Sequence, residues 1–278
     1  MDFEQICKDI KSLKIQGAQN IAKVGVQAFK LKHDKASIKK LLSLRPTEPT
    51  LVNAINFCLK DPKKNPALAL KHLEGSQKTI AKYGARKIKK GDIVYTHCHS
   101  STVTATIKEA YKNKKFEVYN TETRPLYQGR ITATELAKAK IPVTHFVDSA
   151  ARYALKRATI MFIGADAIFS NGKVANKIGS ELFAEVAKKY DTPVYICTDS
   201  WKFDAQTIFG YDTRIERRGA KEIWKKPPKG VNIKNIAFEL VDPNVIDGVI
   251  SELGIYNMDN FVAEVKKAYP WMIESNVP

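Results

Sequence analysis

The sequence predicts an α/β protein with an N-terminal helical domain at residues 1–90 and a Rossmann-like domain with a mainly parallel sheet at residues 91–278. Before Gly91, apolar residues recur at helical spacing, which is the pattern of amphipathic helices. After Gly91, short apolar runs alternate with helical segments, and this alternation indicates βαβ units. The length of 278 residues and the hydrophobic share of 44% fit one large or two modest globular domains.

The first 90 residues contain several expected helices. Apolar side chains lie three and four positions apart at Phe3, Ile6 and Ile10, and again at Ile21, Val24, Ala28 and Phe29. Two prolines within residues 45–49 predict a break, because proline disfavours helix in the residue before it. Pro66 is placed to open a further long helix.

Six apolar runs after Gly91 are the expected strands. They span residues 93–96, 116–119, 143–147, 160–163, 194–197 and 236–240, with helices expected near 101–112, 132–139, 149–156 and 179–189. Thr132 and Glu135 have the spacing of a capping box at the start of one helix. Asn171 and Gly172 predict a tight turn, and Pro243 and Asn257 predict the starts of two C-terminal helices.

Composition narrows the function classes. The net charge of +17 creates a field that attracts nucleic acid or a multiply anionic metabolite. The lysines are spread along the chain, so a solvated, Lys-rich surface is the plainer interpretation and nucleic acid is not the expected partner. No apolar run approaches the roughly 20 residues of a membrane helix, and the first residues lack the features of a signal peptide. We therefore expect no membrane partner and a cytoplasmic protein.

Neither a metal nor a cofactor is expected. The four cysteines form no C-x-x-C pair, which argues against a disulfide framework and a cysteine zinc site. His97 and His99 share one face of an extended segment, but no carboxylate or third histidine stands at a spacing that is typical of a metal site. The glycine-rich dinucleotide and P-loop patterns are absent.

Polar residues gather where the expected strands end. Cys98 follows the first strand, Arg124 the second, Asp166 and then Lys177 the fourth, and Lys202 the fifth. A parallel sheet brings such positions to one edge, where ligands bind. A thiol and a carboxylate can transfer protons, and Arg, Lys and helix N-termini bind phosphate. The structural alternatives are a buried cysteine for Cys98, a turn or cap residue for Asp166 and a surface charge for Arg124.

The motifs at these positions occur in a specific order. They are His-Cys-His-Ser at 97–100, Thr-Glu-Thr-Arg-Pro at 121–125, Asp-Ser-Ala-Ala-Arg at 148–152, Gly-Ala-Asp at 164–166, Asn-Lys-Ile-Gly at 176–179 and Trp-Lys-Phe at 201–203, with Arg-Pro-Thr at 45–47 upstream. The set resembles the archaeal ribose-1,5-bisphosphate isomerases. That family shares a superfamily with the methylthioribose-1-phosphate isomerases and the alpha, beta and delta subunits of translation initiation factor 2B.

The resemblance implies site residues. It assigns catalysis to Cys98 and Asp166, and the substrate-binding positions are Gln16, Gly17, Arg45, Ser100, Arg124, Asn176, Lys177 and Lys202. Two positions depart from the family pattern. Gln16 replaces an arginine that contacts phosphate, and Asp199 with Trp201 replaces the usual glutamate and tyrosine or phenylalanine.

The resemblance also implies a reaction. Ribose 1,5-bisphosphate becomes ribulose 1,5-bisphosphate by Cys/Asp proton transfer through a phosphoenolate, in AMP and nucleoside degradation that feeds Rubisco. No cofactor or metal is required, and the Cys98 thiol is expected near its thiolate form. The family further implies a homo-oligomer, either dimer or hexamer, and AMP as an effector. The alternatives are a non-catalytic regulatory protein like the initiation factor subunits, and a related sugar-1-phosphate aldose-ketose isomerase.

Overall fold

A computed structural model describes residues 2–12, 14–15, 17–45, 48–211 and 218–274. The described part before Gly91 is helical, as predicted, and comprises α1 (Phe3–Lys11), α2 (Ala18–Leu31), α3 (Lys35–Ser43), α4 (Pro49–Lys60) and α5 (Asn65–Ala85). The carboxylates of Asp2 and Asp34 cap α1 and α3, and prolines occupy the first turns of α4 and α5, where a missing N–H costs nothing.

A seven-stranded sheet forms the second part, and it is mainly parallel, as predicted. Its order is β10-β9-β7-β4-β1-β2-β3, and the pairing of β10 with β9 is antiparallel. The strands are β1 (Ile93–Thr96), β2 (Glu117–Thr121), β3 (Val143–Phe146), β4 (Ile160–Ile163), β7 (Val194–Cys197), β9 (Gly248–Ser251) and β10 (Gly254–Tyr256). The central strands β1 and β4 therefore end at the same edge, beside β7.

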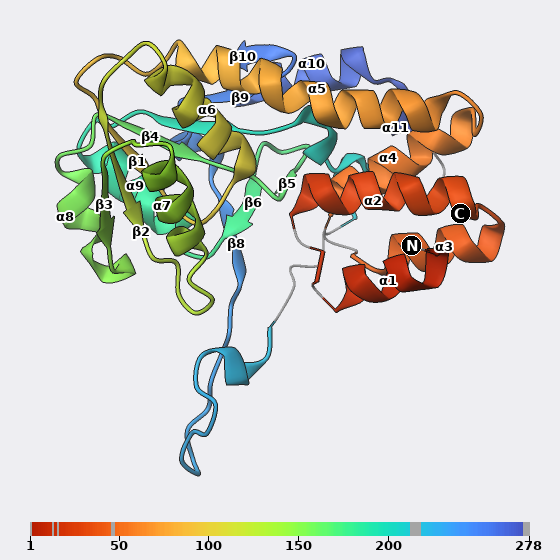
Figure 1. Cartoon of the computed structure of the whole chain (residues 1–278), viewed down its shortest axis with the longest axis horizontal. Coiled ribbons are helices and arrows are strands. Elements are labelled where there is room, and N and C mark those ends of the chain that lie inside the picture. The colour runs from red at the N-terminus through yellow and green to blue at the C-terminus, as the bar shows by residue number, and fades with distance from the viewer. Residues whose placement is uncertain (1, 13, 16, 46–47, 212–217, 275–278) are drawn as a thin grey trace.

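Helices cover both faces of this sheet. They are α6 (Ser101–Tyr111), α7 (Gln128–Lys138), α8 (Ala151–Leu155), α9 (Ser180–Lys189) and α10 (Met258–Ala268), followed by α11 (Trp271–Glu274). Side chains alternate along each strand, so Val94 of β1 packs with the α6 side of the sheet and Tyr95 with the α9 side. Helix α5 lies against α6 and also against α2 and α4, and it bridges the two parts of the molecule (Figure 1). Among the described residues, no helix is both long enough and apolar enough to cross a membrane.

Three local predictions are wrong. The run at 236–240 belongs to β8 (Phe238–Val241), which joins β5 (Ala167–Ile168) and β6 (Val174–Lys177) in a separate antiparallel sheet. Pro243 opens a single 3₁₀ turn that leads to the β9–β10 hairpin and not to a helix. Thr132 lies inside α7, which already starts at Gln128, and its hydroxyl donates to the carbonyl of Cys98. Asn257 does cap α10, as predicted.

Gly129 allows α7 to approach the end of β2. A Cβ at this position would stand 1.8 Å from the carbonyl oxygen of Thr121, so Gly129→Ala forces the backbone apart. We expect the free energy of unfolding in urea to fall by about 1–3 kcal/mol. The matched control is Gly75→Ala, at an exposed position of α5 where a Cβ meets nothing within 4 Å. There the change is expected to stabilise the helix by roughly 0.5–1 kcal/mol. Equal effects of the two substitutions would contradict this account of Gly129.

Candidate active site

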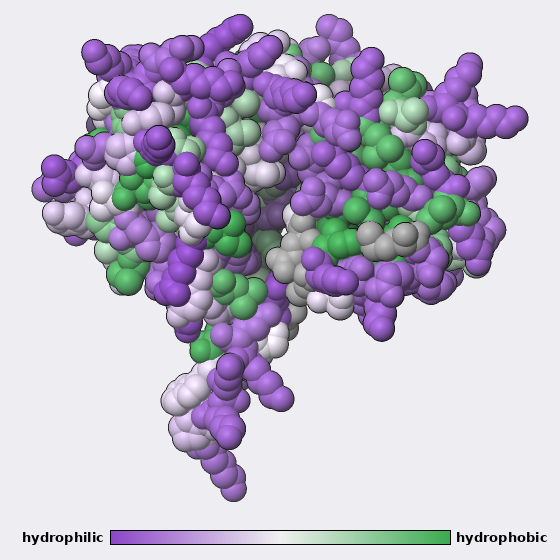
Figure 2. All heavy atoms as spheres, viewed as in Figure 1, coloured by the Kyte–Doolittle hydropathy of each residue, from purple (hydrophilic) through white to green (hydrophobic). Residues whose placement is uncertain are grey.

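A cavity of about 310 Å³ lies where the strand ends of the sheet meet the N-terminal helices. Figure 2 shows the surface hollowed between these two parts of the molecule. Most of the residues predicted for the site line this cavity: Gly17, Arg45, Cys98, Ser100, Asp166, Asn176, Lys177 and Lys202. The structure therefore brings a thiol, a carboxylate and three cations from distant segments into one space.

Cys98 is held at both of its peptide groups. Its φ of 64° is in the left-handed region, which non-glycine residues rarely adopt and which is often found at functional sites. The N–H of Cys98 donates to Thr123 Oγ1 over 2.9 Å, and Thr132 Oγ1 donates to the carbonyl of Cys98 over 2.8 Å. These two hydroxyls fix the turn that presents the sulfur to the cavity.

The loop after β2 supports this turn. Asp148 accepts hydrogen bonds from the peptide N–H groups of Thr123, at 2.9 Å, and Arg124, at 2.7 Å. Thr123 in turn bonds the N–H of Cys98. Asp148 is therefore two hydrogen bonds away from the catalytic candidate, although its own side chain is not among those that line the cavity.

His97 is a neutral structural residue. Its Nε2 lies 2.9 Å from the carbonyl of Ile178 and its Nδ1 lies 2.7 Å from Thr121 Oγ1. Because a carbonyl only accepts, Nε2 carries the proton and Nδ1 accepts from the threonine. Burial lowers the pKa of His97 to about 4. The ring thus ties the end of β1 to the segment that follows Lys177.

Burial raises the pKa of the Cys98 thiol to about 11, although Lys177 and the N–H of His99 oppose the shift. The negative charges of Asp166 and Asp148 add to the increase. The expectation that the free thiol lies near its thiolate form is therefore wrong for this structure. Desolvation of the thiolate outweighs the attraction of the nearby cation.

The alkylation rate of Cys98 should show this directly. Of the four cysteines, Cys98 is partly exposed and the other three are buried. We expect its reaction with iodoacetamide to accelerate about tenfold per pH unit from pH 7 to pH 10, because only the thiolate reacts. Lys177→Met should slow labelling at any given pH, since this cation lowers the pKa of the thiol. A rate that levels off below pH 8 would contradict the raised pKa, and Cys98→Ser supplies the unlabelled control.

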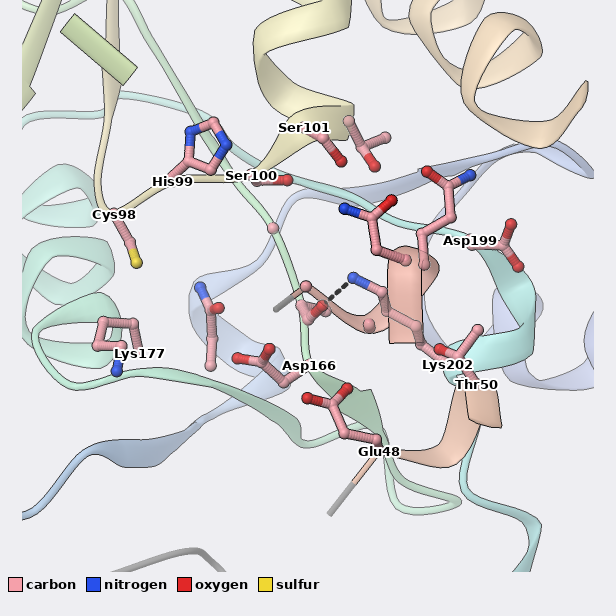
Figure 3. Close-up of a pocket in the computed structure, with 18 of the residues that line it drawn as sticks. Glu48, Thr50, Cys98, His99, Ser100, Ser101, Asp166, Lys177, Asp199 and Lys202 are labelled. Carbon is pink, nitrogen blue, oxygen red and sulfur yellow. Dashed lines mark hydrogen bonds between the residues drawn. The ribbon is translucent and has the colours of Figure 1, made fainter. Parts of the chain in front are cut away.

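Asp166 and Lys202 meet at the turn after β4. The N–H of Asp166 donates to the carbonyl of Ala175 over 2.8 Å, which joins this turn to β6. Lys202 Nζ donates to the carbonyl of Ala165. In Figure 3, Cys98 and Lys177 lie on one side of the cavity, Lys202 and Asp199 on the other, and Asp166 between them.

Several further lining groups suit an anion. Lys177 is buried, with Nζ 4.3 Å from the centre of the Phe238 ring. Arg45 is also buried, and its Nη2 lies 3.2 Å from Glu48 Oε1. Ser100 caps α6, whose N-terminus opens on the cavity. A helix N-terminus and buried cations together favour phosphate binding.

Arg124 lies apart from this group. It is not among the residues that line the cavity. Its guanidinium donates to the hydroxyl of Tyr127 over 2.7 Å and to the carbonyl of Ile223 over 3.4 Å. Gln16, another predicted binding position, lies outside the described residues, whereas its neighbour Gly17 is the N-cap of α2 and lines the cavity.

Sequence reasoning missed two charged groups of the cavity. Arg218 lines it with a side chain that is only 12% exposed, and its Nη1 lies 3.8 Å from Glu222. Glu48 lines it beside Arg45. Both follow stretches without a predicted strand, so no strand-end argument could select them. Asp199 also lines the cavity; it belongs to the polar segment that follows the strand at 194–197 and is a departure from the family motif.

Among the described residues, His72, Asp199 and Glu252 have ligand atoms within 4.8 Å of one another. These atoms already form hydrogen bonds with one another and with the backbone. His72 Nε2 donates to Asp199 Oδ1 over 3.0 Å, and Glu252 accepts from the N–H of Ser200 over 3.1 Å. The group therefore fits a hydrogen-bonded cluster better than a metal site, in which ligand lone pairs point to the ion.

Comparisons with known proteins show which family the chain resembles. Residues 12–258 match the initiation factor 2 subunit family. Ribose 1,5-bisphosphate isomerase from Pyrococcus furiosus is 32% identical over 99% of this chain and 96% of its own length. The enzyme of the same name from Archaeoglobus fulgidus is 34% identical over 90% and 88%. The crystal structure of translation initiation factor eIF-2B from Pyrococcus horikoshii superposes with a TM-score of 0.82 at 26% identity, over 94% of this chain and 98% of that one.

Proposed function

The chain belongs to the initiation factor 2 subunit family as an isomerase, and we propose that it converts ribose 1,5-bisphosphate to ribulose 1,5-bisphosphate. The observation that carries the proposal is the shared cavity of Cys98 and Asp166, lined also by Arg45, Lys177 and Lys202. Two proton-transfer groups among cations suit a sugar with two phosphates. The relatives of this name are similar to the chain over nearly its whole length.

The chemistry explains the residue types. A sugar phosphorylated at C1 has no anomeric hydroxyl, so its ring cannot open by loss of that proton. Instead the bond from C1 to the ring oxygen breaks while the ring oxygen gains a proton from Asp166 and C2 loses its proton to Cys98. A phosphoenol with a C1–C2 double bond results. Cys98 then returns a proton to C1, and Asp166 takes the proton of the C2 hydroxyl to leave the ketone.

Cys98 and Asp166 must share one proton when the reaction begins. Burial holds that proton on the sulfur in the free protein and raises the pKa of Cys98. In our proposal the proton passes to Asp166 when the substrate is bound, which gives a thiolate base and a carboxylic acid. Asp166 is one of the charges that act on the thiol, so the two groups are electrostatically coupled. Both are restored at the end of the cycle.

The phosphates account for the remaining groups. We assign them to Arg45, Lys177 and Lys202, with Asn176, Ser100 and the N-terminus of α6 as further donors. Arg124 and Gln16 keep this role only as expectations from the family. A homo-oligomer, AMP activation, a place in AMP breakdown and a cytoplasmic location are proposed on the same resemblance, and sedimentation with and without AMP would test the assembly.

A direct assay tests the reaction. Ribose 1,5-bisphosphate, methylthioribose 1-phosphate and ribose 5-phosphate are supplied separately, and products are followed by NMR. We expect turnover of the bisphosphate above the other two, because two phosphates match cations on opposite sides of the cavity. Preferred turnover of methylthioribose 1-phosphate would replace this substrate with the related one.

A regulatory role is the second candidate. The likeness to the solved initiation factor eIF-2B structure, with a TM-score of 0.82, favours it. The presence of both Cys98 and Asp166 in the cavity favours catalysis. Absence of turnover with all three sugars, together with capture of an initiation factor by the purified chain, would support the regulatory role.

A further inference from the structure

We propose that His72 is a positioning residue for the active site, which acts through Asp199 and Glu252 on the segment that carries Lys202. The proposal rests on the function above, because it concerns how that reaction's groups are held. His72 lies in the middle of α5, Asp199 follows β7, and Glu252 lies in the turn between β9 and β10. Three separate elements thus meet at one buried cluster.

The cluster is tightly packed. His72 Nε2 donates to Asp199 Oδ1 over 3.0 Å and lies 3.9 Å from Glu252 Oε1. The exposed fractions of the three side chains are 16%, 8% and 11%. The imidazole also stacks on Trp201, with ring centres 4.1 Å apart and planes inclined by 16°. Burial makes each of these polar contacts costly to lose.

The cluster forms hydrogen bonds with the backbone next to Lys202. Asp199 Oδ1 accepts from the N–H of Trp201 over 2.9 Å, and Glu252 accepts from the N–H of Ser200 over 3.1 Å and also bonds its hydroxyl. On the other side, Asn53 Nδ2 donates to the carbonyls of Trp201 and Phe203, each over 2.8 Å. The residues on both sides of Lys202 are therefore fixed by side chains from other elements.

Lys202 passes this constraint to the catalytic turn. Its Nζ donates to the carbonyl of Ala165, the residue before Asp166. Movement of the Lys202 segment therefore displaces both a phosphate ligand and the support of Asp166. A misplacement of about 1 Å can cost roughly a hundredfold in rate. His72 does not line the cavity, so its effect on catalysis must pass through these contacts.

Four titratable groups face one another in the cluster: His72 from α5, Asp199 after β7, Glu252 from the hairpin turn and Tyr269 after α10. Burial opposes the charge on His72, but Asp199 and Glu252 outweigh it and raise the pKa of His72. Burial and the charge of Asp199 raise the pKa of Glu252 to about 7. As pH rises, Glu252 becomes charged beside Asp199 and His72 loses its proton. The electrostatic attraction that holds the cluster together is therefore strongest at acidic pH and weakens as the pH becomes alkaline.

The test uses the full-length protein with three variants. His72→Phe keeps a ring against Trp201 but removes the hydrogen bond and the charge, and His72→Gln keeps a donor without the charge. His33→Phe is the matched control, because His33 also stacks on an aromatic ring, with centres 5.0 Å apart, and makes one hydrogen bond of 3.2 Å. His33 is not among the cavity residues. The KM and kcat for ribose 1,5-bisphosphate and the affinity for ribulose 1,5-bisphosphate are measured from pH 6 to pH 9, with circular dichroism as the check of folding.

We expect His72→Phe to lower kcat/KM by roughly 10- to 100-fold at pH 6.5, with a higher KM and weaker product binding. The difference in kcat/KM between His72→Phe and the parent should become smaller toward pH 9. The kcat/KM of His72→Gln should lie between those of the parent and His72→Phe. If His72→Phe does not fold, His72→Gln alone decides by its altered pH profile. Parent-like KM and pH dependence in a folded His72 variant would overturn the positioning role. Failure of the proposed function itself looks different, because the parent would then show no turnover of the bisphosphate.

Discussion

Cys98→Ser is expected to lower kcat by about 10²–10⁴-fold, the usual contribution of a positioned acid or base. In the proposed mechanism the sulfur accepts the C2 proton and delivers one to C1. A serine hydroxyl is a far weaker acid than a thiol, so its anion is not available at neutral pH. The turn should survive, because Thr123 and Thr132 bond the peptide groups of this residue and not its side chain.

Two measurements make this result specific. Steady-state turnover of ribose 1,5-bisphosphate gives the loss in kcat, and calorimetry with ribulose 1,5-bisphosphate shows whether the cavity still binds. We expect binding close to that of the parent, because the phosphate ligands are other residues. A Cys98→Ser variant that turns over the bisphosphate at the parent's rate would remove the thiol from the mechanism.

Asp166→Asn is expected to produce a loss of similar size, about 10²–10⁴-fold in kcat. The amide has the shape of the carboxyl group but cannot donate an acidic proton to the ring oxygen or later accept one from the C2 hydroxyl. The peptide N–H of residue 166 still bonds the carbonyl of Ala175, so the turn after β4 should remain. The variant tests the ring-opening step separately from the C2-to-C1 transfer.

The matched control is Asp191→Asn, a substitution in the turn that follows α9. Its φ of 53° is left-handed, and asparagine tolerates that region well. We expect it to leave kcat unchanged. The double variant Cys98→Ser with Asp166→Asn should be little worse than either single one, because groups that act as a unit are not additive. Multiplied losses in the double variant would show that the two groups act independently.

Local pattern was sufficient for much of the sheet. The runs that became β1, β4 and β7 were predicted with the bounds the structure has, because each is a short apolar segment between turn signals. The β9–β10 hairpin was missed. Its strands have four and three residues and begin with glycine, so they are too short to show a period. Val249 and Ile250 are fully buried, but that burial depends on the pairing of β9 with β7 and on the core clusters on the two faces of the sheet.

Thr132 shows how tertiary contacts override a local signal. Its spacing to Glu135 is that of a capping box, yet α7 starts four residues earlier, at Gln128. The hydroxyl is used by the carbonyl of Cys98, 34 positions away in the chain. The hydrogen bond between His72 and Asp199 joins residues 127 positions apart, and no local sequence pattern around either residue indicates it.

The order of strands and polar residues along the chain was enough to predict part of the chemistry that reaches the cavity, but not Arg218 or Glu48. Polar residues that follow parallel strands must gather at one edge of the sheet, so this pattern alone placed Cys98, Asp166 and Lys202 together. Lys177 reaches the cavity from the end of β6 in the antiparallel sheet. The electrostatic state of these groups and the contacts that support them depend instead on tertiary packing. Nearby cations suggested a thiolate, but desolvation depends on everything packed around the sulfur, and it raises the pKa of Cys98 to about 11. Burial is a sum over contacts distant in sequence, and no motif records it.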